Sequence, residues 1–234
     1  MNNNINFETF LLINPKKIII SVNTFSEFKN IYQKELTIEN TSDQIDFEKL
    51  DYFLSQNILK IEKILNDFIK RIHVIIDQKQ FFSLELSIKK NNYENFINHK
   101  SLNYLLNEAK ENCKKTIDER RIIHMIIKDY YINNIKYSSF TESNKSGNLS
   151  LDLNFICLSN SFIKILEKKL KKYQISIDKI VCEDYVKNSL INDEKNIFYM
   201  TKKILNGFNS NEVLLVNKKQ KNVGFFEKFF NFFN

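Results

Sequence analysis

The chain has 234 residues, of which 43% are hydrophobic, and its 35 lysines and arginines outnumber its 28 aspartates and glutamates, for a formal net charge of +7. This length and apolar content suit one domain, or two small ones, with a sizeable core. The three glycines, Gly147, Gly207 and Gly224, lie too far apart for the glycine-rich loops that hold phosphate in P-loop and dinucleotide-binding proteins.

The positive charge alone is a weak indicator of function, because proteins encoded by AT-rich genomes are generally rich in Lys, Asn, Ile and Phe. We expect no nucleic-acid partner, since the aromatic residues do not alternate with arginine on an obvious strand face. The cysteines Cys113, Cys157 and Cys182 indicate no disulfide or zinc site and fit a reducing cytosol. His73 and His124 lie in apolar runs without a second ligand at metal-binding spacing, so core or interstrand positions are favoured.

The sequence shows no nucleophile–base pair, metal set or cofactor motif. It therefore predicts no catalytic, cofactor-binding or metal-binding residue, and an enzyme is the least expected class. The opening residues MNNNINFETF lack the basic start and apolar core of a signal peptide, and no apolar run is long enough to span a bilayer.

The first half of the chain is predicted to mix strands with one long helix. After an irregular lead-in of about a dozen residues, residues 17–22 and 29–38 are predicted as two strands of a hairpin. Between residues 47 and 69 the apolar positions step by three and four, which predicts a helix of about six turns. Residues 72–76 and 82–88 are predicted as strands, the second with regular alternation.

In the second half, Ser101 is a candidate cap for a helix that reaches Cys113, residues 121–133 are rich in strand formers, and 135–147 form a polar loop. Residues 147–181 predict a strand, a helix and a strand, because leucines alternate with polar residues before an apolar stripe that faces a lysine-rich side. Ser159, Asn160 or Ser161 would cap this helix. Helices near 184–190 and 197–205 and an extended piece at 213–216 follow.

The C-terminal segment carries the strongest functional signal. Gly224 precedes FFEKFFNFFN, whose phenylalanines would fall within an arc of about 160° on a helix. These residues are Phe225, Phe226, Phe229, Phe230, Phe232 and Phe233. Lys221 in the preceding basic linker and Lys228 on the polar side could contact anionic headgroups. We favour an in-plane membrane helix, which binds weakly and reversibly as one copy, over a helix docked on the protein's own core.

The order of these segments resembles the FtsA family of bacterial cell-division proteins, which are actin-like membrane tethers. The resemblance is best from Ser101 to Glu194, where DERRIIHMIIKDYYINN is similar to a family pattern of Arg and then His-x-Ile-Pro-x-x-Tyr-x-Ile-Asp. The matching positions are His124, Ile126, Tyr130 and Ile132, while Ile127 replaces the proline and Asn133 the aspartate. The glycine-led strand, helix and strand and the Phe-rich ending are also similar to the family.

The resemblance implies an α+β fold. A partial actin-like (ribonuclease H-like) first lobe would carry an inserted SHS2-type subdomain of sheet and helix, and a C-terminal amphipathic helix would follow. Residues 1–80 would form the start of the lobe, 81–178 the SHS2-type subdomain and 179–216 the return to the lobe. Residues 217–223 would then be a basic linker and 224–234 the membrane helix.

The departures from the family concern nucleotide binding. The family's first hairpin carries an Asp and a Gly that hold phosphate and metal, whereas this chain has Ser21-Val22-Asn23-Thr24-Phe25 at that turn. The second glycine-rich phosphate loop and its lobe have no counterpart after Asn192. We therefore expect no ATP binding by the family mode.

Two functions remain. The first is a non-catalytic FtsA-like division protein, a tether and scaffold on the cytoplasmic face of the bacterial inner membrane at the division site. Its partners would be an anionic membrane surface, other division proteins and further copies of itself. The second is a membrane-peripheral adaptor of another envelope assembly, of the pilus-assembly actin-like type. The resemblance implies protein contacts through the SHS2-type subdomain, with Tyr131, Tyr137 and Tyr130 as candidate anchors, although a core position suits Tyr130 equally well.

Overall fold

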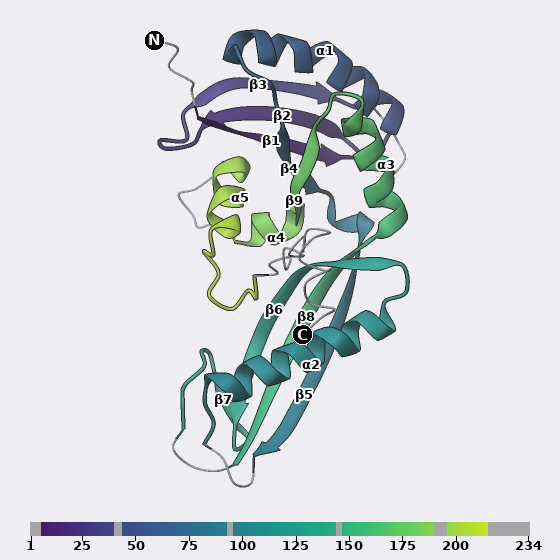
Figure 1. Cartoon of the computed structure of the whole chain (residues 1–234). Helices are drawn as coiled ribbons and strands as arrows, with labels where there is room; N and C mark the ends of the chain where they lie inside the picture. The colour runs from purple at the N-terminus through teal and green to yellow at the C-terminus, as the bar shows by residue number, and fades with distance from the viewer. Residues whose placement is uncertain (1–5, 40–43, 93–95, 144–146, 190–195, 215–234) are drawn as a thin grey trace, which may run out of the picture.

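The computed structural model describes residues 6–39, 44–92, 96–143, 147–189 and 196–214. Its first sheet has five strands in the order β3-β2-β1-β4-β9 (Figure 1). The antiparallel strands are β1 (Phe7–Asn14), β2 (Lys17–Thr24) and β3 (Asn30–Thr37), and the strands parallel to β1 are β4 (Arg71–Ile76) and β9 (Ser176–Cys182). This topology confirms the predicted α+β class.

Helices cover both faces of the first sheet. On one face, α1 (Phe47–Leu65) and α3 (Asn160–Lys171) bury Leu54, Ile61 and Leu166 against the strands. On the other face lies α5 (Ile197–Leu205), whose Phe198 ring is centred 6.0 Å from the ring of Phe10 in β1. The short helix α4 (Glu183–Asn188) follows β9 directly and packs beside α5 (Figure 1). The sheet is therefore buried between two helical layers.

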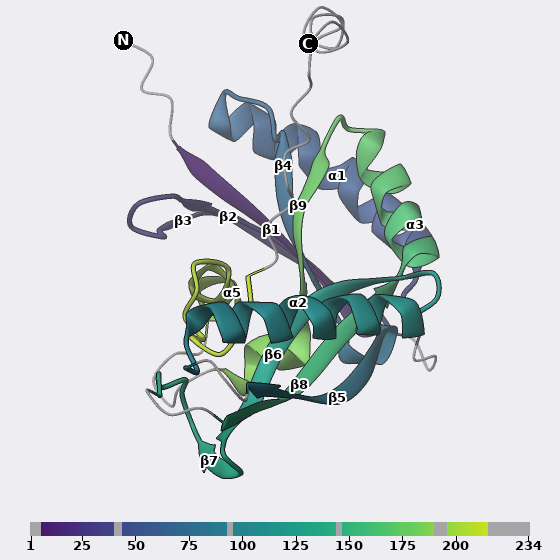
Figure 2. The same cartoon turned by 60° about the horizontal axis from the view of Figure 1, so that its bottom comes forward.

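A second, antiparallel sheet in the order β5-β8-β6-β7 is inserted between β4 and β9, after a single 3-10 turn at Gln78–Gln80. Its strands are β5 (Phe81–Asn92), β6 (Arg120–Ile132), β7 (Ile135–Tyr137) and β8 (Gly147–Ser159). Helix α2 (His99–Thr116) lies across one face, where Leu105, Ala109 and Phe155 are buried (Figure 2). The other face carries polar residues, among them Ser87, whose hydroxyl donates to Asp152 at 2.6 Å. Its assignment as an SHS2-type subdomain stays a prediction.

The segment 147–181 forms the predicted strand, helix and strand. β8 buries alternate residues from Leu149 to Cys157 against α2, and the Ser159 hydroxyl accepts the Ser161 amide at the start of α3. α3 then returns the chain to the first sheet, so one continuous segment links both sheets (Figure 1).

Several local predictions are wrong. The expected irregular lead-in is in fact β1, an interior strand buried on both faces, so its apolar run lacks the alternation of a half-buried strand. α1 ends at Leu65 rather than near residue 69, because Asn66 adopts the left-handed conformation with a φ of 51°. α2 begins earlier than predicted and is capped by Asn98, not Ser101. The expected polar loop 135–147 begins with the short strand β7.

Candidate interaction cleft

A cleft of about 450 Å³ lies where the two sheets meet. α2 and α3 form two of its walls, and the first residues of β6 and the middle of β9 form the others. Its lining includes Ile122, Ile123, Ile177 and Ile180, which give it an apolar floor. This inter-sheet cleft also has charged walls formed by Lys110, Lys114, Arg120, Arg121, Glu167, Asp178 and Lys179.

Positive charge dominates these walls, with five basic side chains against two carboxylates. Some of this charge is already compensated, because Lys114 pairs with Glu111 at 2.7 Å and Asp178 lies 3.9 Å from Arg71. Within the described part of the chain, Lys110, Arg121 and Lys179 form no ion pair. A ligand that carries several carboxylates, with apolar groups between them to contact the isoleucines of the floor, would complement this cleft.

The cleft also presents open strand edges. β9 is the edge strand of the first sheet, and its one described strand partner is β4. At residues 120–124, β6 pairs with β8 on one side, and the described residues contribute no strand on its other side. An extended peptide could therefore add main-chain hydrogen bonds to side-chain contacts.

A buried polar network fixes β6 against β9 next to the cleft. His124 of β6, 3% exposed, accepts the backbone N–H of Cys182 through Nε2 at 3.1 Å. Its Nδ1 lies 2.7 Å from Glu212 Oε1, and the Tyr185 hydroxyl donates to Glu212 Oε2 at 2.7 Å. Asn209 donates to the Tyr185 hydroxyl at 2.9 Å. We call these four side chains the His124 clamp.

The hydrogen bonds of the clamp determine which atoms of His124 and Tyr185 carry a proton. The Cys182 amide can only donate, so Nε2 must be the unprotonated nitrogen and Nδ1–H donates to the carboxylate. Burial, together with the bond to Glu212, raises the pKa of Tyr185, which keeps its hydroxyl protonated as a donor. The network thus joins three chain segments and matches the predicted interstrand position of His124.

The turn at residues 21–25, which was predicted to lie in the first hairpin, lies in the second one, because β1 and β2 form the first hairpin through Pro15 and Lys16 and residues 21–25 lead from β2 toward β3. Inside this second hairpin, Asn30 Nδ2 donates to both Ser21 Oγ and Asn23 Oδ1, each at 3.3 Å. At its mouth, Lys202 of α5 forms an ion pair with Glu8 at 2.7 Å. The same ammonium donates to the carbonyl of Phe25 and lies 4.4 Å from the centre of that residue's ring. The positive charge at this turn is therefore already paired within the chain.

The three predicted anchor tyrosines differ in exposure. Tyr130 is 4% exposed and belongs to the second core, with its hydroxyl bonded to Asn211 at 3.2 Å, so it offers a partner little surface. Tyr131 is half-buried on β6, beside Asp152 on the polar face. Tyr137 is 37% exposed on β7. These tyrosines do not line the inter-sheet cleft.

The described residues contain no group of His, Cys, Asp and Glu side chains that could hold a metal ion. Their three cysteines are buried, and burial raises the pKa of Cys157 to about 12 and that of Cys182 to about 11. Neither thiol is therefore suited to form a thiolate at neutral pH.

The predicted membrane-binding residues, from Lys221 to Phe233, lie outside the described residues. Among the helices that are described, none has both the length and the apolar character needed to cross a bilayer.

The sequence did not predict the cleft. The Arg120-Arg121 pair was visible at the start of a strand, but Lys179 lies 58 residues later, and only the inserted topology brings these residues together. No sequence motif marks Glu212, since its role depends on one buried contact to His124 of β6.

No protein-family model and no curated protein matches the chain. Among solved structures, the cytoplasmic domain of EpsL, an inner membrane component of the type II secretion system of Vibrio cholerae, is similar with a TM-score of 0.39 and 10% identity, over 76% of this chain and 59% of that one. The PilM–PilN type IV pilus biogenesis complex is similar with a TM-score of 0.42 and 7% sequence identity. The match covers 77% of this chain and 48% of that one. A Bacteroides thetaiotaomicron protein with an actin-like ATPase fold and unknown function is similar with a TM-score of 0.32 and 10% sequence identity. The match covers 79% of this chain and 56% of that one.

The chain thus spans 48% to 59% of the length of these proteins. At these identities and scores the likeness concerns the arrangement of the backbone, and it establishes neither membership of the FtsA family nor a function.

Proposed function

We propose that the protein is a non-catalytic, membrane-peripheral adaptor that holds an acidic, extended segment of a partner protein in the inter-sheet cleft. The cleft carries the proposal, because its excess of basic side chains, its apolar floor and its open strand edges are complementary to such a segment. Membrane attachment would come from residues 224–234, whose sequence predicts an amphipathic helix with six phenylalanines on one side.

An adaptor without nucleotide chemistry is supported by the turns that follow β1 and β2. Neither the β1–β2 turn, Asn14-Pro15-Lys16-Lys17, nor residues 24–29 between β2 and β3 contain glycine, so neither turn offers the glycine-rich amide cradle that binds phosphate. We expect no tight binding of a fluorescent ATP analogue with Mg²⁺ in an equilibrium titration. Saturable micromolar binding that unlabelled ATP displaces would refute this.

Site-specific photo-cross-linking in cells tests the cleft. A benzophenone amino acid at Ile177, inside the cleft, should capture a segment that mass spectrometry identifies as rich in aspartate and glutamate. The double substitution Arg121→Glu and Lys179→Glu should abolish this capture, because it changes the sign of two cleft charges that have no ion pair among the described residues.

The same cross-linker at Tyr137 tests the competing surface on β7. Capture at Tyr137 alone, or capture at Ile177 that is unaffected by the double substitution, would contradict the cleft proposal. Loss of the Tyr137 product after Tyr131→Ala would then assign the partner to the tyrosine surface.

The resemblance of the sequence supports a division assembly at the inner membrane as the setting. An adaptor of a pilus or secretion assembly would need the same cleft and the same membrane attachment. A fluorescent fusion distinguishes the two: a band at midcell supports division, whereas signal at the poles or evenly around the envelope supports the other assemblies.

A further inference from the structure

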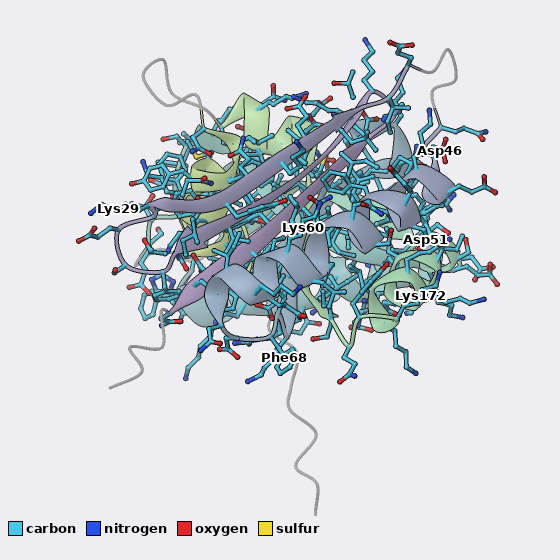
Figure 3. All side chains as sticks on the ribbon, turned by 90° about the horizontal axis from the view of Figure 1, so that it is seen from above. Lys29, Asp46, Asp51, Lys60, Phe68 and Lys172 are labelled. Atoms are coloured by element: carbon cyan, nitrogen blue, oxygen red, sulfur yellow. The ribbon has the colours of Figure 1, made fainter. Side chains whose placement is uncertain are left out.

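The helices α1 and α3 lie side by side on one face of the first sheet, and no described element covers their outer surface (Figures 1 and 3). They are joined through Asp51 of α1, whose carboxylate accepts from Lys169 at 2.5 Å and from Lys172 at 2.9 Å. Figure 3 views this junction from above, with Asp51 next to Lys172. The two helices therefore form one continuous outer layer.

Large apolar side chains are exposed along this layer. Tyr52 and Leu59 of α1 are 63% and 64% exposed, Phe68 just after α1 is 70% exposed, and Ile165 of α3 is 42% exposed. Tyr52 and Leu59 are about two turns apart and share the side of α1 opposite to its buried residues. Apolar side chains gathered in this way indicate a surface that has a partner.

Lysines lie among these apolar side chains. Lys60 and Lys63 of α1 and Lys164 and Lys168 of α3 are exposed, and within the described ranges none of them forms an ion pair. Among the carboxylates of the two helices, Asp51 is paired with two lysines, Glu62 accepts the Ile69 amide, and Glu167 lines the inter-sheet cleft. Counted together, the two helices carry seven lysines against these three carboxylates and Glu48, so positive charge prevails. We call the surface formed by these four lysines with Tyr52, Leu59, Phe68 and Ile165 the α1–α3 face.

We propose that the α1–α3 face lies against an anionic bilayer and orients the folded body on it. Exposed aromatic and aliphatic side chains enter the headgroup region, while lysine stems extend beside them and bring the ammonium groups to the phosphates. In this orientation the second sheet, at the opposite end of the molecule in Figure 1, is directed away from the bilayer. The inference rests on the membrane attachment proposed above and adds a second, oriented contact to it.

The chain has no tryptophan, so one introduced tryptophan reports on its own surroundings. In full-length protein with phosphatidylglycerol-containing vesicles, the fluorescence of Phe68→Trp should shift to the blue and be quenched by brominated lipids. Phe96→Trp is the matched control, since Phe96 is 62% exposed and precedes α2 of the second sheet, and its emission should not change. Equal emission changes at both positions, or none at Phe68→Trp in protein that sediments with the vesicles, would overturn the proposal.

Charge reversal provides a second readout. Lys164→Glu with Lys168→Glu should lower partitioning onto anionic vesicles at least about tenfold, because each basic residue near the surface contributes substantially to binding. Lys100→Glu with Lys115→Glu on the exposed side of α2 should lower it less than about threefold. Unchanged partitioning of the α3 variant, with loss of an acidic protein partner instead, would assign the face to that protein and overturn the membrane contact. Failure of wild-type protein to sediment with vesicles at all would instead contradict the proposed membrane attachment.

Discussion

Individual buried polar residues determine how the two sheets meet. His124 was predicted to be a core or interstrand residue from its apolar surroundings, and its burial confirms this. The sequence could not show its partners, because Glu212 and Cys182 lie 88 and 58 residues away. These residues come within hydrogen-bonding distance of His124 only in the folded chain.

The His124 clamp should contribute strongly to stability. His124→Ala leaves the buried Glu212 carboxylate and the Cys182 amide without their partner and creates a cavity, so it should lower the free energy of unfolding by about 3 kcal/mol. The control is His99→Ala, since the side chains of His99 and Glu142 are 73% and 56% exposed and their atoms lie 3.9 Å apart, so its loss should stay below about 0.5 kcal/mol. Urea unfolding followed by circular dichroism measures both, and equal losses would contradict the clamp.

His73 should make stability depend on pH. Burial lowers the pKa of its imidazole, and the nearby carboxylates of Asp178 and Glu8 offset this only in part. Because the folded pKa lies below the unfolded value of about 6.5, the unfolded chain binds more protons as the pH falls below that value. This contribution to stability is therefore complete above about pH 6.5 and is lost as the pH falls toward the folded pKa, with a slope of at most about 1.4 kcal/mol per pH unit.

His73→Gln should flatten this dependence in urea melts between pH 7.5 and 5.5. An unchanged slope in His73→Gln would show that other groups cause it.

At the scale of elements, periodicity predicted the helices and half-buried strands well. The segment 147–181 and the long helix α1 were predictable because each has one buried face. β1 was not predictable in this way, because both of its faces are buried and Phe10, Leu11, Leu12 and Ile13 form an unbroken apolar run. Helix boundaries depended on single polar side chains, which periodicity does not reveal.

The cap of α2 is such a case. Asn98 accepts the amides of Lys100 at 2.9 Å and Ser101 at 3.1 Å, so Asn98→Ala should lower stability by about 1 kcal/mol. Asn103→Ala, at an exposed position inside the same helix, should be neutral or slightly stabilising, because alanine has the higher helix propensity. Thermal melts compare the two variants. A loss at Asn103 equal to that at Asn98 would contradict the assigned cap.

At the scale of the whole molecule, the fold class was predictable and the cleft was not. The sequence predicted an α+β fold with an inserted unit of sheet and helix, and the structure has a second sheet with α2 between β4 and β9. The cleft exists only because β6 of the insertion and β9 of the lobe meet, and no local pattern encodes that meeting. The adaptor proposal therefore joins a surface found in the folded structure to a tail whose role is inferred from the sequence.

Recruitment of the captured partner segment to vesicles tests the adaptor proposal most directly. A fluorescent peptide of the segment cross-linked at Ile177 should sediment with phosphatidylglycerol-containing vesicles only when the full-length protein is present. With Arg121→Glu and Lys179→Glu the protein should still sediment but the peptide should not, and deletion of residues 224–234 should leave most of both in solution without lowering the melting temperature. Peptide recruitment that survives the cleft substitutions, or a tail deletion that leaves vesicle binding intact and destabilises the body, would contradict the account.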